Sequence, residues 1–229
     1  MKTLMGLTLA AALAGAAGGA QAQAPVQVVE LFTSQGCSSC PPANAAVAQL
    51  ANRPEILALS FGVTYWDDLG WKDTFASPKF TARQWDYARG FKHDQVFTPQ
   101  VIVNGRKDGV GAAPREFAGL IAAGDRGARG PALSLTANQV AVAAAPTAGP
   151  ADVWLVRYDP RLVQVPIRRG ENGGKTLPHR NVVKELVRLG AWSGQAARYA
   201  IPKAADPALK TAILIQLPRG GPILAAARG

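Results

Sequence analysis

The sequence is poor in cysteine, aromatic residues and charged residues, and each shortage excludes a class of protein. Two cysteines among 229 residues exclude a disulfide-stapled miniprotein and allow at most one intramolecular disulfide. Aromatic residues make up 7%, which leaves few rings on which nucleic-acid bases could stack. Charged residues make up 17% and hydrophobic residues 48%, unlike the composition of a disordered chain. We therefore expect a folded protein with a buried core.

The N-terminus has the pattern of a secretory signal peptide. Lys2 is followed by an apolar, alanine-rich run to Ala20 and then by small residues, which predicts cleavage after Ala22 and removal of residues 1–22. An uncleaved membrane anchor is less favoured, because the run is short for a span. We expect a periplasmic or secreted protein in an oxidising compartment, with no stable membrane insertion after cleavage. Nucleic-acid binding is not expected there, despite a formal net charge of +10.

Residues 25–123 alternate between strand and helix patterns, which predicts an α/β domain. Apolar, β-branched segments predict strands at 26–32, 56–63 and 100–103. Helices are predicted at 43–50, from Pro78 to about 88, and from Pro114 onward, the last two with proline in the first turn. The pair Asn104-Gly105 predicts a hairpin turn into 106–110.

Residues 124–131 are rich in glycine and charge and are predicted to be a linker to a second domain. Short strand patterns between Gly/Pro turns predict a mostly β, sandwich-like domain over 132–229. Residues 181–189 fit either helix or strand, and we assign them to a strand because their neighbours are strands. Basic residues gather in this half: Arg157, Arg161, Arg168, Arg169, Lys175, Arg180, Lys184 and Arg188. A solvated surface is favoured over a site for an anionic partner.

Both cysteines stand in one short motif, Cys37-Ser38-Ser39-Cys40, after a predicted strand and at a predicted helix start. The N-terminus of a helix favours a thiolate, and a C-x-x-C turn can close into a disulfide that exchanges readily. We expect Cys37 to point outward as the nucleophile and Cys40 to resolve the mixed disulfide. A structural disulfide is less favoured, because so short a loop restricts the unfolded chain little.

Metal binding is the other alternative for the two cysteines. A zinc site would need further ligands, and the chain offers no second cysteine pair and only His93 and His179. Two thiolates could bind copper(I), but the mature chain has no methionine to assist them. We expect neither a metal nor an organic cofactor, since the dithiol is itself the redox group.

Thr98-Pro99 directly precedes the predicted strand at 100–103. A cis bond there would place the backbone of Thr98 beside the cysteines, where its N–H and C=O could pair with a substrate chain. A trans proline before a strand is the commoner arrangement for an isolated proline. Only the combination with the upstream C-x-x-C favours the cis form.

The order strand, C-x-x-C, helix and Thr-Pro before a strand resembles the thioredoxin-like superfamily. The segments VVELFTSQGCSSCPPA, YWDDLGWKDTFASPKFTARQ, VFTPQVIVNG and RGENGGKTLPHRNVVKEL resemble a family of secreted bacterial proteins catalogued as domain of unknown function 1223. The resemblance implies a thioredoxin-like domain and an envelope location, but no known reaction. Gly62-Val63-Thr64 stands where the family pattern has His-Val-Asp, so an acid–base histidine is not available at that position.

Glu30 lies in the first predicted strand, seven residues before Cys37. Thioredoxins have a buried acidic residue on the corresponding strand, which implies that Glu30 could accept a proton from Cys40; burial would favour its neutral form. A water-facing glutamate is about as well supported, because the spacing differs by one residue. Trp66, Trp71 and Trp85 could line a substrate cleft, although core packing is the commoner role.

These patterns together predict a secreted thiol–disulfide oxidoreductase with Cys37, Cys40, Thr98, Pro99 and Glu30 in its site. Its partners would be protein thiols or disulfides and an unidentified redox partner. The alternative from another class is a non-catalytic binding or scaffold protein with a static disulfide. The reduction potential separates the two, because a static disulfide should resist glutathione.

Overall fold

The computed structural model describes residues 25–229, so the predicted signal peptide lies outside the described residues. The helices are α1 (Pro41–Leu50), α2 (Pro78–Phe91) and α3 (Pro114–Ala123). Proline stands in the first turn of each, where its missing N–H costs nothing. Ser77 caps α2 by accepting the N–H of Lys79 at 3.3 Å. These helix positions agree with the sequence-based prediction.

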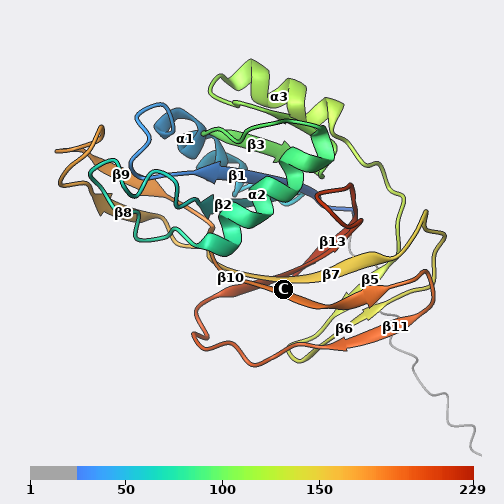
Figure 1. Cartoon of the computed structure of the whole chain (residues 1–229). Coiled ribbons are helices and arrows are strands. Elements are labelled where there is room, and N and C mark those ends of the chain that lie inside the picture. Colours follow the sequence, from blue (N-terminus) through green and yellow to red (C-terminus); the bar gives the residue numbers. More distant parts are fainter. Residues whose placement is uncertain (1–24) are drawn as a thin grey trace, which may run out of the picture.

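Strands from both halves of the chain build one large mixed sheet (Figure 1). Its strands are β1 (Gln27–Thr33), β2 (Ile56–Gly62), β3 (Gln100–Val103), β4 (Lys107–Gly109), β7 (Ala151–Asp159), β10 (Val182–Trp192), β12 (Lys210–Gln216) and β13 (Ile223–Arg228). Their order across the sheet is β13-β12-β7-β10-β2-β1-β3-β4. β1 and β2 are parallel, and β1 and β3 are antiparallel.

Two smaller sheets accompany the large one. The first has the order β11-β6-β5 and consists of β5 (Leu133–Leu135), β6 (Gln139–Val142) and β11 (Ala197–Ala200). The second is a hairpin of β8 (Val163–Pro166) and β9 (Thr176–His179), which lies beside α1 (Figure 1). The loop that joins β8 to β9 carries residues 167–175.

The large sheet is covered on both faces. Helix α2 packs on one face, where Phe80 and Tyr87 join an apolar cluster that reaches from β1 to β13. On the opposite face, α1 and α3 cover the strands around β1, and the β11-β6-β5 sheet covers β7 and β12. The large sheet thus has sandwich-like packing at one end and helix-on-sheet packing at the other. The prediction of an α/β fold with a mostly β portion is confirmed.

The structure differs from the prediction of a separate domain over 132–229. β10 pairs in parallel with β2 through Val182 and Ser60, so the two sets of strands share one sheet. The Ser60 N–H donates to the Asn181 carbonyl at 3.0 Å, and the Asn181 side chain donates to the Ala58 carbonyl at 2.7 Å. Strand pairing between segments more than 120 residues apart leaves no local sequence signal, which is why the pattern suggested two domains.

Residues 124–131, which the sequence predicts to be a linker, are held in place by hydrogen bonds. Arg126 is 8% exposed and donates hydrogen bonds to the carbonyls of Val26, Arg129 and Leu224. The segment therefore connects α3 to β5 while contacting β13. The glycine and charge content suggested a linker between domains, but Arg126 within it anchors the segment.

Two finer predictions are confirmed. Residues 181–189 fall within the long strand β10 apart from Asn181, which precedes it. Asn104 and Gly105 both have positive φ, 50° and 61°, and join β3 to β4 in a tight hairpin. Among the helices of residues 25–229, none combines the length and the apolarity that crossing a membrane requires.

Candidate functional site

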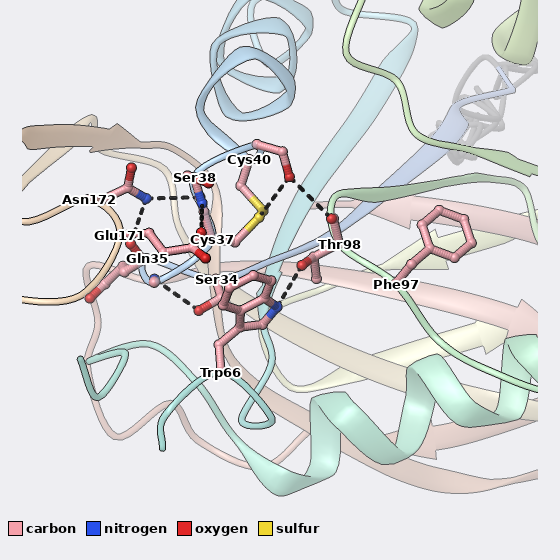
Figure 2. The surroundings of a disulfide bond; sticks show 12 residues. Ser34, Gln35, Cys37, Ser38, Cys40, Trp66, Phe97, Thr98, Glu171 and Asn172 are labelled. Carbon is pink, nitrogen blue, oxygen red and sulfur yellow. Dashed lines mark hydrogen bonds between the residues drawn. A yellow bond between two sulfur atoms is a disulfide. The ribbon is translucent and has the colours of Figure 1, made fainter. Parts of the chain in front are cut away.

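The Cys37–Cys40 pair lies at the junction between β1 and α1, and the two residues form a disulfide (Figure 2). Cys40 is the N-cap residue of α1, and its N–H donates to the Cys37 carbonyl at 3.3 Å. Cys37 Sγ lies 3.3 Å from the Ser39 hydroxyl oxygen. The first cysteine therefore precedes the helix and the second begins it, which is the placement that the sequence predicts.

The loop before β3 lies directly against this turn. The Thr98–Pro99 peptide bond is cis, as predicted. The Ser39 hydroxyl lies 3.5 Å from the Thr98 carbonyl oxygen and can donate to it. On the other side of Thr98, the Trp66 indole N–H donates to the Thr98 hydroxyl at 2.8 Å. Trp66 and Thr98 therefore border the cysteine turn (Figure 2).

The loop between β8 and β9 belongs to the C-terminal half of the chain, and it covers the cysteine turn (Figure 2). Asn172 is fully buried, and its side-chain amide donates to the carbonyls of Gln35 at 3.0 Å and Cys37 at 2.8 Å. Next to it, the Glu171 carboxylate accepts the backbone N–H of Ser38 at 3.1 Å. We call residues 168–175 the flap, because they lie over the cysteines.

The flap changes one part of the predicted site. We expected Cys37 to reach solvent, but both cysteines are fully buried, with exposures of 0%. The cysteines are buried because the flap and Thr98 pack against the turn. Local sequence patterns do not reveal these contacts. A reagent can reach Cys37 only after these neighbours move.

A polar network fixes the chain just before the cysteines. The Gln35 N–H donates to the Asp73 carboxylate at 2.7 Å, and the Gln35 side-chain oxygen accepts the Trp71 indole N–H at 2.9 Å. Burial raises the pKa of Asp73, while the N–H groups of Gln35 and Phe75 partly oppose that rise. Trp71 thus supports the site, whereas Trp85 on α2 is 37% exposed.

Glu30 is fully buried but belongs to a different network. Its carboxylate accepts hydrogen bonds from Arg83 Nε at 2.8 Å and Nη2 at 3.1 Å, and from the Tyr87 hydroxyl. Arg83 also donates to the Gln216 side chain at 3.0 Å. Burial lowers the pKa of Arg83, but the neighbouring Glu30 carboxylate outweighs this and raises it.

This network lies on the α2 face of the sheet, whereas α1 begins on the opposite face. The structure therefore does not bring Glu30 together with Cys40, and its geometry gives no support to the predicted proton-acceptor role. The alternative of a water-facing Glu30 is wrong, since the side chain is fully buried. A buried ion pair with Arg83 accounts for its position.

Of the basic residues in the C-terminal half, Arg168, Arg169 and Lys175 belong to the flap. Within residues 25–229, no group of three or more His, Cys, Asp or Glu side chains is placed to hold a metal ion. In the basic C-terminal half, Arg161 pairs with Asp159 at 2.7 Å and Arg188 with Asp152 at 2.6 Å. Arg157 is buried rather than solvated, with an exposure of 4%.

Sequence reasoning did not assign Glu171 and Asn172 to the site. They stand within the segment RGENGGKTLPHRNVVKEL, which carries part of the family resemblance. The glycines offer a local signal: Gly170 and Gly174 have positive φ, 73° and 81°, as a tight turn requires. The turn could be predicted from the glycines, but its contact with residues more than 130 positions earlier in the chain could not.

Comparison with known proteins identifies a family and two solved structures that are similar to this chain. The model of the family described as "Protein of unknown function (DUF1223)" matches residues 28–216. The crystal structure of protein AGR_C_4864 from Agrobacterium tumefaciens is similar, with a TM-score of 0.75 and 30% sequence identity, and the match covers 90% of this chain and 95% of that one.

A second solved structure, HBP35 of Porphyromonas gingivalis, has a TM-score of 0.64 at 14% identity. That match covers 90% of this chain and 75% of that one. At such low identity the likeness concerns the fold alone. No curated protein matches the chain.

Proposed function

The chain belongs to the DUF1223 family of proteins of unknown function, and we propose that it is a thiol–disulfide oxidoreductase of the cell envelope. In this proposal Cys37 is the nucleophile, Cys40 the resolving thiol, and Thr98 with Pro99 the contact for the substrate chain. The observation that carries it is the juxtaposition of three features: a C-x-x-C disulfide, the start of α1, and the Thr98 backbone.

The arrangement around β1 supports the thioredoxin-like resemblance that the sequence suggests. β1 is flanked by parallel β2 and antiparallel β3, and the C-x-x-C turn follows β1 directly. Helix α1 begins at the second cysteine, so its N-terminal N–H groups favour a thiolate nearby. The envelope location rests on the predicted signal peptide at residues 1–22.

The proposed chemistry is two successive thiol–disulfide exchanges. A substrate thiolate attacks Cys37 Sγ, the Cys37–Cys40 bond breaks, and Cys40 leaves as a thiolate that takes up a proton. A second substrate thiolate then attacks the substrate sulfur of the mixed disulfide and releases Cys37. The substrate loses two electrons and two protons, and the protein gains them. The same steps in reverse reduce a substrate disulfide, with the protein becoming oxidised.

One observation favours the alternative of a scaffold with a static disulfide: both cysteines are fully buried beneath the flap. The two functions differ in redox behaviour. We expect the disulfide to equilibrate with glutathione or with a stronger dithiol, and the reduced protein to exchange with a model disulfide protein. Cys37→Ser should abolish the exchange. A disulfide that stays oxidised in excess dithiol under native conditions would support the scaffold instead.

A further inference from the structure

The flap places a carboxylate beside the proposed nucleophile. Glu171 Oε2 lies 3.1 Å from the backbone nitrogen of Ser38, the residue that directly follows Cys37 (Figure 2). Covalent geometry puts that nitrogen within about 5 Å of Cys37 Sγ. The two distances together keep the carboxylate oxygen within about 8 Å of Cys37 Sγ, and a negative charge so close opposes ionisation of a thiol.

The same flap also controls access to Cys37. Asn172, the neighbour of Glu171, binds the Cys37 carbonyl at 2.8 Å and is held in turn by Lys175, whose ammonium donates to the Asn172 side-chain oxygen at 3.1 Å. Cys37 is fully buried, so a substrate thiol can reach it only after its neighbours move, and Asn172 is one of these neighbours. An opening that moves Asn172 away from Cys37 must move Glu171 as well, because the two residues are adjacent in the chain.

Combining these two contacts, we propose that Glu171 is a positioning residue that couples access to Cys37 with the acidity of its thiol. With the flap closed, the Glu171 carboxylate opposes the Cys37 thiolate and occupies the Ser38 N–H. With the flap displaced by a substrate chain, that charge leaves, the N–H is freed, and Cys37 ionises. The step is a proton release from the Cys37 thiol to solvent, and no electron is transferred in it. This inference rests on the proposed function, in which Cys37 is the nucleophile.

The surrounding charges are consistent with this role. Glu171 is exposed, and its hydrogen bonds with Ser38 lower its pKa, so it is negatively charged at neutral pH. Asp73 accepts the Gln35 N–H, and Lys175, within the flap, binds Asn172. Arg168 and Arg169 are the other charged residues of the flap. Asp73 and Lys175 have opposite charges, and both remain in the substitution described next.

The test is the pH dependence of alkylation of Cys37 by iodoacetamide, measured in the full mature chain carrying Cys40→Ala. The midpoint of the profile reports the acidity of the thiol, and the plateau at high pH reports access. Glu171→Gln should lower the midpoint by about half a pH unit and leave the plateau unchanged within about twofold. Asn172→Ala should raise the plateau several-fold, because it releases the flap.

Glu116→Gln is the matched control, because Glu116 also accepts backbone N–H groups, from Gly111 and Ala112, but belongs to α3. It should change neither value. An unchanged midpoint in Glu171→Gln would overturn the proposal, and so would an equal change in Glu116→Gln. These readouts need no substrate, so a shifted midpoint in a protein that exchanges no disulfides would refute the proposed function and leave the effect of Glu171 intact.

Discussion

Replacing His179 should remove a pH-dependent loss of stability, because the protein buries a neutral imidazole there. His179 ends β9, is 3% exposed, and packs edge-on against Phe75 with ring centroids 5.6 Å apart. Its Nε2 is buried and has no hydrogen-bond partner among residues 25–229. Burial, and to a lesser degree the charge of Lys184, lower the pKa of His179 from 6.5 to about 4.

The sign follows from which state takes up the proton first. As pH falls below 6.5, the unfolded chain protonates His179 while the folded protein does not, so the free energy of unfolding decreases. The loss is complete below about pH 4, where both states are protonated. The gap between the two pKa values corresponds to about 3 kcal/mol. Above pH 6.5 this residue contributes no pH dependence.

Urea unfolding of the oxidised mature protein, measured in steps between neutral pH and about pH 4, provides the assay. His179→Leu should lose about 3 kcal/mol less over this range than the wild type, whatever its stability at neutral pH. Carboxylates that titrate in the same range cancel in the difference. His93→Gln is the control, since His93 is the other histidine and is 39% exposed on its side chain. Equal losses in wild type and His179→Leu would refute the reasoning.

Three further predictions concern the ion pair, the flap and the domain boundary. Glu30→Gln should cost about 3 kcal/mol of stability in urea, because it leaves the Arg83 charge buried without its carboxylate, and should leave the Cys37 alkylation midpoint unchanged. A shifted midpoint would restore Glu30 to the site. Asn172→Ala should speed reduction of the disulfide by dithiothreitol several-fold, as followed by thiol release; an unchanged rate would mean that the flap does not limit access. Limited proteolysis should not release two folded pieces by cutting within 124–131, and two stable fragments would contradict the shared sheet.

Local chemistry made the centre of the site predictable. Cys37 and Cys40 stand after a β-branched run and before residues that favour a helix, and these patterns need no distant information. The cis Thr98–Pro99 bond was inferred from its combination with the C-x-x-C motif. The pair Asn104-Gly105 made the turn between β3 and β4 predictable, because few residue pairs adopt two positive φ angles at low energetic cost.

Long-range pairing made the rest unpredictable. Strand β13 has no strong strand pattern of its own, because its Ala225–Ala227 run has no β-branched residue, and it forms by pairing with β12. The pairing of Val182 with Ser60 connects β10 to β2, and the local sequence pattern of neither strand indicates that pairing. Glu30 showed the same limit: its strand was predicted, but the partner Arg83 that decides its role lies 53 residues away.

Trapping of mixed disulfides in the native host tests the central claim most directly. A Cys40→Ala variant retains Cys37 but lacks the thiol that resolves a mixed disulfide, so substrates should remain covalently attached to it. The account predicts envelope proteins attached through Cys37, released by reductant, and absent from the Cys37→Ala variant. Equal adducts from both variants, or none from the reduced Cys40→Ala protein, would contradict an oxidoreductase that works through Cys37.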